Sequence, residues 1–338
     1  MKNRILAKIR SDKAIYTLRL LVQWGVFGWC LLLGIQLGLF VRHFESGGVA
    51  PYYPRFPGVE AFLPIGALVS LKNWLVNGAI DPIHPAALVL FLTFVTMALL
   101  ARKSFCSWLC PVGTLEEFLW KLGQRLWGRV WHPWRWIDWQ LRALKYLLLL
   151  FFIKLILFDM PAMAVKGFLA APYWALADVK MLHFFLSLTG IPLITIILLL
   201  VLSLFLRNPW CRYLCPYGAL LGLGSFFSPL RIRRNRENCI TCGTCANVCP
   251  ARLPVARKTQ IFSPECTGCL TCVAHCPKPG ALAMAAGRKP LPSWFFALLV
   301  LGVFTLGVTG GMLSGHWQTA LSYSDYQQLI PLAPSLSH

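Results

Sequence analysis

Charged residues are scarce in this chain, and acidic residues are the scarcest. Only 13% of its 338 residues are charged, whereas ordinary soluble domains have about 25%. Asp and Glu together number 12, beside 32 Lys and Arg, and 57% of the residues are hydrophobic. The composition therefore predicts a chain built largely for lipid. The sequence also lacks C-x-x-C-H and S/T-G-A-T motifs, so attached c-type haem and covalently bound flavin are not expected.

Apolar runs long enough to approach a membrane crossing recur along the chain. Residues 65–80 are interrupted by Lys72, Asn73 and Asn77, which predicts an interfacial or re-entrant helix instead. The first run is not expected to be a cleaved signal peptide, because no small-residue cleavage site ends it. The predicted crossings are residues 20–41, 85–101, 144–158, 184–206 and 294–312.

Basic residues are distributed unevenly between the two sides of these crossings. The segments up to residue 19, from 102 to 145 and from 207 to 289 carry 26 Lys and Arg, and the rest of the chain carries six. Cytoplasmic loops are enriched in Lys and Arg, so the N-terminus faces the cytoplasm and five crossings place the C-terminus outside. This topology explains the net charge of +20, and no nucleic-acid partner is expected.

Two cysteine runs follow the fourth predicted crossing. They read "CITCGTCANVCP" at residues 239–250 and "CTGCLTCVAHCP" at residues 266–277. Each is C-x-x-C-x-x-C-x-x-x-C-P, the bacterial ferredoxin run for cubane iron–sulfur clusters. Small residues such as Gly243 and Gly268 allow the backbone to wrap closely around a cluster. A disulfide framework would not fit a reducing cytoplasm, and eight cysteines in two identical runs exceed what zinc requires.

The fourth cysteine of each run precedes proline, is held extended and is expected to reach the partner cluster. The sequence therefore predicts two [4Fe–4S] clusters with crossed ligation. Cluster 1 would be held by Cys239, Cys242, Cys245 and Cys276, and cluster 2 by Cys266, Cys269, Cys272 and Cys249.

A second cysteine pattern occurs twice, 105 residues apart. "CSWLCPVG" begins at Cys106 and "CRYLCPYG" at Cys211, each after an apolar run and a basic residue. The similarity indicates an internal duplication, which would bring equivalent positions together. Proline suits the first turn of a helix, although Thr114 and Glu117 form a capping-box pattern that would start the first of these helices slightly later. Cys110 and Cys215 are therefore expected near helix N-termini, where the dipole favours thiolate.

The four twin-motif cysteines, Cys106, Cys110, Cys211 and Cys215, thus form a candidate site at the cytoplasmic membrane surface. Three interpretations remain open. The cysteines hold a third metal centre of iron–sulfur type, they act as a thiol redox relay, or they are buried structural cysteines. The spacing alone does not choose between them.

Four histidines lie at the predicted outer helix ends: His43, His84, His183 and His316. They could ligate b-type haem or accept protons from quinol. The favoured interpretation is that histidine is simply well accommodated at a membrane interface.

The combination of twin C-x-x-x-C-P motifs with a paired ferredoxin run resembles the membrane polyferredoxins typified by NapH, the C-terminal half of NosR and YccM-type proteins. The resemblance covers residues 15–285, including "RLLVQ" at 19–23 and "DPIHP" at 81–85. It implies electron transfer between membrane quinol and a redox partner protein. The fifth predicted crossing and the tail after it depart from NapH, and the chain has no large flavin domain like that of NosR.

We therefore predict a polytopic α-helical membrane protein of about five crossings with a small α+β, ferredoxin-like two-cluster domain in the cytoplasm. It would lie in the bacterial cytoplasmic (inner) membrane and pass electrons between the quinol pool and a partner oxidoreductase, which leaves open whether it is the quinol dehydrogenase component of a chain. The alternative is an accessory factor for metal-cofactor assembly or reductive maturation. The predicted regions are a basic tail (1–19), a four-helix membrane domain (20–230), the ferredoxin domain (231–290) and a fifth helix with an outer tail (291–338).

Overall fold

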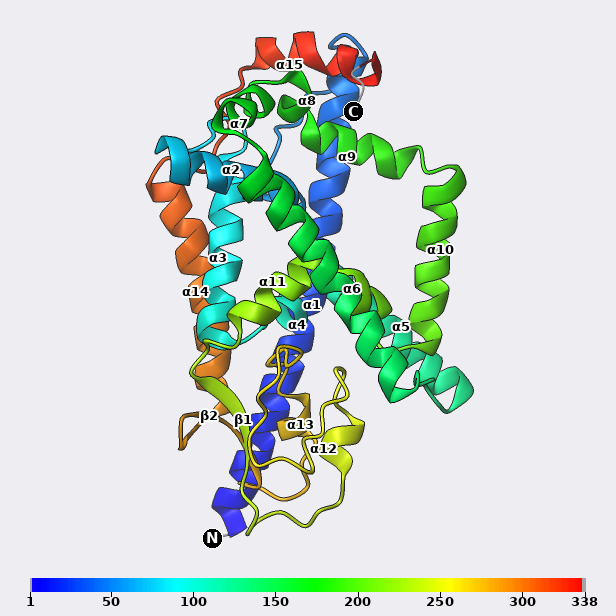
Figure 1. Cartoon of the computed structure of the whole chain (residues 1–338), viewed down its shortest axis with the longest axis vertical. Helices are drawn as coiled ribbons and strands as arrows, with labels where there is room; N and C mark the ends of the chain where they lie inside the picture. Colours follow the sequence, from blue (N-terminus) through cyan, green and yellow to red (C-terminus); the bar gives the residue numbers. More distant parts are fainter. Residues whose placement is uncertain (1, 336–338) are drawn as a thin grey trace. The chain divides into compact units, whose positions relative to one another are not determined.

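A computed structural model describes residues 2–335, and the described chain is mostly helical (Figure 1). It divides into two compact units. Unit 1 contains the chain up to Phe27, Phe94–Leu149 and Ile196–Thr305, and unit 2 contains Gly28–Thr93, Leu150–Thr195 and Leu306 onward. The α-helices are α1 (Lys2–Glu45), α2 (Pro64–Asn77), α3 (Pro85–Ala101), α4 (Phe105–Trp108), α5 (Pro111–Trp127), α6 (Arg135–Ile153), α7 (Ala162–Leu169), α8 (Pro172–Ala175), α9 (Ala177–Leu186), α10 (Gly190–Phe205), α11 (Pro216–Gly224), α12 (Thr244–Asn247), α13 (Thr271–Ala274), α14 (Ser293–Leu313) and α15 (Tyr323–Leu329).

Two described helices are long and apolar enough to cross a membrane: Ser11–Glu45 within α1, and α14. Two further candidates are bent pairs, because the helix over Arg135–Asp159 turns by 105° into α7 and α9 turns by 77° into α10. The shorter α3 is also apolar. The fourth predicted run, 184–206, is therefore not one straight helix, since the chain breaks at Ser187 and resumes at Gly190 with a left-handed φ of 60°. Two to four crossings are supported, and the number five remains a prediction.

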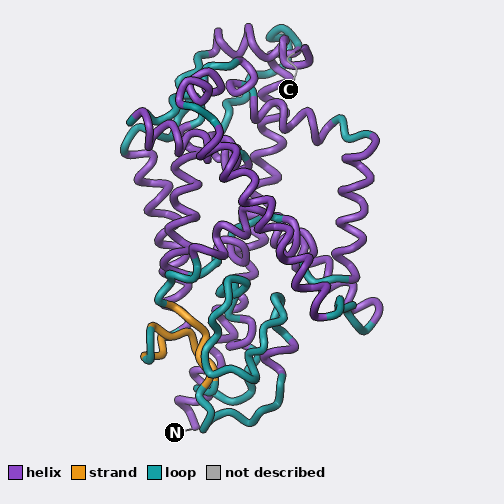
Figure 2. The backbone as a smooth tube through the Cα atoms, viewed as in Figure 1, coloured by secondary structure: helices purple, strands orange, loops and turns teal. Residues whose placement is uncertain are grey.

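The strands form one small sheet beside the cysteine runs, and they are the only orange segments in the tube of Figure 2. β1 (Leu230–Arg234), β2 (Leu282–Ala286) and β3 (Lys289–Leu291) pair antiparallel in the order β1-β2-β3. Ile232 lies opposite Met284, and both side chains are buried. The sheet therefore joins the two ends of the cysteine-containing segment, and most of that segment is loop with the short helices α12 and α13.

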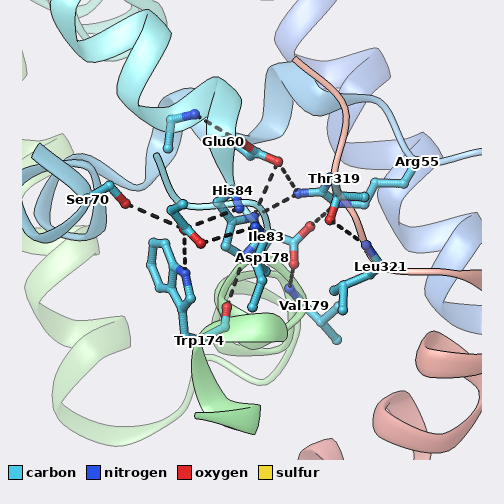
Figure 3. A network of polar contacts seen from close by, with 12 residues as sticks. Arg55, Glu60, Ser70, Ile83, His84, Trp174, Asp178, Val179, Thr319 and Leu321 are labelled. Carbon is cyan, nitrogen blue, oxygen red and sulfur yellow. Dashed lines mark hydrogen bonds and ion pairs between the residues drawn. The ribbon is translucent and has the colours of Figure 1, made fainter. Parts of the chain in front are cut away.

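A buried charge network organises unit 2 (Figure 3). The Arg55 guanidinium donates to Asp178 (Nε–Oδ2, 2.5 Å) and to Glu60 (Nη2–Oε1, 2.8 Å), and the second oxygen of Glu60 accepts from the backbone N–H of Ala87, 3.0 Å away. His84 lies 3.3 Å from Glu60. Asp178 and Glu60 also accept hydrogen bonds from backbone N–H groups in the first turns of α9 and α3, where a negative charge is favourable.

These and similar contacts explain two of the four histidines singled out in the sequence. His84 is fully buried, and its Nε2 lies 2.8 Å from the carbonyl of Trp174. His43 bonds the Ala50 carbonyl through Nδ1 and the Tyr323 hydroxyl through Nε2. Both ring nitrogens of each residue are thus engaged by the protein, which favours a structural role over haem ligation.

Candidate metal centres

The two ferredoxin runs share an unusual backbone conformation. In each run, the residues directly before and after the second cysteine have left-handed φ angles: Thr241 (53°) and Gly243 (75°) in the first, Gly268 (63°) and Leu270 (56°) in the second. Two of these four are not glycine, so the conformation has an energetic cost. Alternating conformations of this kind direct successive N–H groups toward one point, which is how backbone binds anionic groups.

Each of two hollows in unit 1 is lined by one of the predicted cysteine sets. One is lined by Cys239, Cys242, Cys245 and Cys276. The other is lined by Cys266, Cys269, Cys272 and Cys249. In both, three cysteines come from one run and the fourth from the other. The residues present therefore fit two cubane clusters with crossed ligation.

The two sets differ in exposure. Cys242 is exposed, and hydrogen bonds from Thr244 hold its pKa below the usual value for a thiol. Cys266 and Cys249 are 8% and 7% exposed, and burial raises the pKa of Cys249 to about 12. The cluster 1 set is thus close to solvent, whereas the cluster 2 set is enclosed by protein.

The twin motifs have matching local structures. The N–H of Cys110 donates to the Phe105 carbonyl at 3.0 Å, and that of Cys215 donates to the Trp210 carbonyl at 2.9 Å. Each second cysteine is extended and is followed by proline as the first residue of a helix, α5 or α11. The expectation of a helix N-terminus is confirmed for both cysteines. The later start suggested by the capping-box pattern is wrong, since α5 begins at Pro111.

A glycine stands three residues after each second cysteine, and the first of the two has no room for a side chain. A Cβ on Gly113 would lie 2.3 Å from the Cys106 carbonyl oxygen. A Cβ on Gly218 would lie 3.4 Å from Cys215 Sγ and 3.3 Å from the Nζ of Lys103. The Gly218 N–H donates to Cys215 Sγ at 3.2 Å. Both glycines therefore allow the chain to pass close to a cysteine.

The structure brings the four twin-motif cysteines together. The thiol of Cys211 interacts electrostatically with those of Cys110, Cys215 and Cys106. Burial raises the pKa of all four thiols, that of Cys106 to about 11. The carboxylate of Glu116 accepts hydrogen bonds from the backbone N–H groups of Trp210 and Cys211 at 2.7 and 3.1 Å, so helix α5 of one repeat fixes the motif of the other.

A buried lysine lies among these thiols. Lys103 is 3% exposed, and its ammonium interacts with Glu265 and with the thiols of Cys106, Cys215 and Cys211. Burial acts to lower the pKa of Lys103, but these neighbours outweigh it and raise that pKa above its usual value. The site is therefore electropositive next to four potential thiolates.

Among the residues described, no group of three or more His, Cys, Asp or Glu is arranged to hold a single metal ion. A cubane instead takes its thiolates at separate corners of a cluster.

Hydrogen bonds and an ion pair join the twin-motif site to the loop that carries the cluster 2 set. Ser107 Oγ donates to the Thr267 carbonyl at 2.8 Å, and Trp108 Nε1 donates to the Gly268 carbonyl at 3.4 Å. Lys145 binds Glu265, the residue before Cys266, at 2.6 Å.

A third hollow lies between the two sites. Cys106 and Cys211 line it on the side of the twin motifs. Pro250, Ala251 and Thr267 line both this hollow and that of the cluster 2 set. These three shared residues therefore separate the two hollows.

The sequence did not single out Lys103, Glu116, Glu265 or Lys145 as functional. Lys103 and Glu265 could have been noticed, because they stand three residues and one residue before a motif cysteine. The positions of Glu116 and Lys145 depend on how distant helices pack, which no local pattern reports.

Comparison with protein families defines the class. The family described as "4Fe-4S binding domain" matches twice, at residues 83–129 and 188–235, and each match contains one twin motif. The family described as "4Fe-4S dicluster domain" matches residues 231–277, which contain both ferredoxin runs. The protein is therefore an iron–sulfur protein of ferredoxin type.

Curated relatives identify the family. YccM of Escherichia coli (strain K12), named as an electron transport protein, is 45% identical over 91% of this chain and 88% of its own length. The ferredoxin-type protein NapH of Haemophilus influenzae is 31% identical over 63% of this chain and 71% of its own length. The regulatory protein NosR of Stutzerimonas stutzeri is 30% identical over 53% of this chain and 24% of its own length.

The chain belongs to the NapH/NosR/YccM-like family of membrane polyferredoxins, which are electron-transport iron–sulfur proteins. This confirms the resemblance on which the sequence prediction rested. No solved structure matches the chain.

Proposed function

We propose that this protein conducts single electrons through iron–sulfur centres between the quinol pool and a partner oxidoreductase in the bacterial cytoplasmic membrane. The observation that carries the proposal is the arrangement of three hollows in unit 1. Two are lined by complete four-cysteine sets, and the third is lined by Cys106 and Cys211 and shares Pro250, Ala251 and Thr267 with the hollow of the cluster 2 set.

The cysteines of the cluster 1 and cluster 2 sets would each hold one [4Fe–4S] cluster. When bound, such clusters supply one-electron redox centres. The surrounding backbone holds the thiolates by its left-handed turns and by N–H groups directed at sulfur, such as that of Leu253 at 3.4 Å from Cys249 Sγ. Burial of the cluster 2 set excludes water from the inner end of the route. Exposure of Cys242 makes the cluster 1 set the end accessible to a partner protein.

The twin-motif cysteines would hold a third iron–sulfur centre. Three features support this over a purely structural role: the mutual proximity of the four thiols, the buried ammonium of Lys103 beside them, and a family described as binding 4Fe-4S that matches each motif. The hydrogen bond to Thr267 and the ion pair with Glu265 hold this site against the cluster 2 loop. The proposed order is therefore twin-motif site, cluster 2, cluster 1.

The proposed orientation places the N-terminus, twin motifs and ferredoxin segment in the cytoplasm and the C-terminus outside, in accord with the basic residues of those segments. Quinol would be oxidised near the twin motifs, at the end of the route opposite to cluster 1. No nucleic acid takes part.

The quinol step can be tested with anaerobically purified full-length protein. A menaquinol or ubiquinol analogue is added, and cluster reduction is followed by EPR. We expect the cluster signals of the reduced state to appear. Intact clusters that stay oxidised with both analogues, yet accept electrons from dithionite, would count against quinol as the donor and favour a role in cofactor assembly or maturation.

The ligand assignment has its own test. Cys276→Ala should remove the same EPR signal as Cys239→Ala, although the two residues stand in different runs. Cys249→Ala should instead remove the signal that Cys266→Ala removes. If Cys276→Ala instead removes the same signal as Cys266→Ala, and Cys249→Ala the same signal as Cys239→Ala, crossed ligation is wrong. Iron content near twelve per chain supports three cubane centres, and a value near eight would exclude the third.

A further inference from the structure

Lys103 is a buried cation whose ammonium makes no hydrogen bond with the residues that the structure describes. It is 3% exposed and lines the hollow beside Cys106 and Cys211. Burying an ammonium group is costly unless an opposite charge lies close by. A lysine that served only for packing could extend its charged end to bulk water, whereas the side chain of Lys103 is buried and ends at this hollow. Its environment must therefore supply negative charge.

The protein's own carboxylates do not supply enough. Glu265 is the carboxylate that acts on Lys103, and it is already bonded by Lys145 at 2.6 Å. Arg212, also on this hollow, is neutralised by Asp138 at 2.9 Å. Two buried lysines thus share one carboxylate, so Glu265 does not offset both of their charges. Lys103 also interacts with the thiols of Cys106, Cys215 and Cys211, and Lys145 adds a second positive charge beside it.

Lys103 serves both repeats. It stands three residues before Cys106, in the first motif, yet its Nζ lies 3.3 Å from the Cβ position of Gly218 in the second, beside Cys215 Sγ. At the equivalent place in the second repeat, three residues before Cys211, is the neutral Asn208. The two repeats therefore differ in charge at this position, with a lysine in the first and a neutral asparagine in the second.

We propose that Lys103 is a positioning charge that raises the reduction potential of the centre held by the twin-motif cysteines. Reduction adds one negative charge to a thiolate-ligated centre, and a fixed positive charge in a site shielded from water stabilises the reduced form more than the oxidised form. The centre would then accept electrons more readily than the same four cysteines could achieve alone. This inference rests on the proposed third centre and assigns the residue that tunes it.

The test is an EPR-monitored redox titration of the full-length holoprotein. In Lys103→Met, the ratio of reduced to oxidised third centre at a fixed potential should fall about tenfold, a shift of 59 mV for a one-electron couple. Lys103→Arg keeps the charge and should retain most of the wild-type potential. Lys289→Met is the matched control, because it removes an exposed lysine from β3 in the same unit. The hollow of the cluster 1 set shares no residue with that of Lys103, so its potential is an internal reference.

The outcomes separate the two proposals. A wild-type chain with about eight irons and two redox transitions would overturn the third centre itself. A third transition that Lys103→Met shifts no more than Lys289→Met does would overturn the role of Lys103 and leave the centre standing. If Lys103→Met lacks the third centre, Lys103→Gln and Lys103→Arg decide. Loss of the third centre in Lys103→Gln together with its retention in Lys103→Arg supports a role for the positive charge. Loss of the centre in both variants overturns that role.

Discussion

The hydroxyl group of Ser107 donates to the carbonyl oxygen of Thr267 at 2.8 Å, across 160 positions of sequence. Ser107 lies inside the first twin motif, and Thr267 lies between Cys266 and Cys269 of the second ferredoxin run. This hydrogen bond, with that from Trp108 to Gly268, joins two segments that carry cysteines of two candidate centres. Distance governs electron transfer, so contacts of this kind determine whether the two centres can communicate.

We expect Ser107→Ala to loosen the cluster 2 loop. Ser107 is 6% exposed, and losing its hydroxyl leaves the Thr267 carbonyl without that partner, at a cost of about 1–3 kcal/mol. Amide hydrogen exchange should accelerate over residues 266–272 and stay unchanged at α12. Ser187→Ala is a suitable control, because its hydroxyl is exposed and bonds only within its own helix end. Equal exchange in the two variants would contradict this role.

Gly113→Ala should disrupt the first twin motif. The added Cβ would lie 2.3 Å from the Cys106 carbonyl oxygen, and a backbone atom cannot move aside as a flexible side chain can. Overpacking of this kind costs about 1–3 kcal/mol. We expect a lower unfolding temperature and a loss of iron from the third centre, measured on purified protein. Gly224→Ala is the control, since its Cβ would meet Ala98 at an ordinary 3.6 Å. A similar iron content in both variants would be evidence that the close approach of Gly113 to the Cys106 carbonyl is not required for the centre.

Local patterns in the sequence predicted much of the candidate site. The ferredoxin spacing groups three cysteines of each hollow, because the wrapping of such a loop depends on residues within a few positions. The fourth cysteine of each hollow comes from the other run, and crossed ligation of clusters stays a prediction. The Cys-Pro pairs likewise predicted the helix starts after Cys110 and Cys215. Glu117 shows the limit of this approach. It fits a capping box, but in the structure its carboxylate binds the guanidinium of Arg19 in α1 at 2.8 Å.

Features that depend on packing between distant segments could not be predicted in this way. The apolar run over 184–206 gave no indication that the chain turns at Gly190, since hydropathy does not report direction. The "RLLVQ" and "DPIHP" stretches were noticed only as resemblances. The structure gives them physical roles: Arg19 and Gln23 both bond Glu117, and Asp81 accepts from the N–H of His84 and from Trp174 Nε1.

Arg55→Met should destabilise unit 2 strongly. The Arg55 side chain is buried and neutralises Glu60 and Asp178, so its removal leaves two carboxylates without their main partner. Breaking a buried ion pair from one side costs about 3–5 kcal/mol. Thermal unfolding in detergent should begin at a lower temperature. Glu45→Gln is the control, because it breaks a partly exposed pair with His183 and should change stability by less than about 1 kcal/mol. Equal unfolding temperatures would show that the network adds no stability.

Protonation of His84 should make the stability of unit 2 depend on pH. Burial acts to lower the pKa of His84 and Arg55 opposes protonation, but the hydrogen bond to Glu60 and the charges of Asp178 and Glu60 outweigh both and raise it. A group whose pKa is higher in the folded state than in the unfolded state binds more protons when folded. Its contribution is therefore complete below about pH 6.5, the ordinary value for histidine, and is lost as the pH rises through the raised pKa.

The difference in unfolding temperature between wild type and His84→Gln isolates this contribution from other titrating groups. Measured by tryptophan fluorescence in detergent over a pH series, the difference should be largest at low pH and decline as the pH rises above 6.5. In a Glu60→Gln background the decline should shrink, because the main group that raises the pKa of His84 has lost its charge. A difference that stays constant or grows with pH would mean that His84 is neutral in the folded protein and that Arg55 alone balances the two carboxylates.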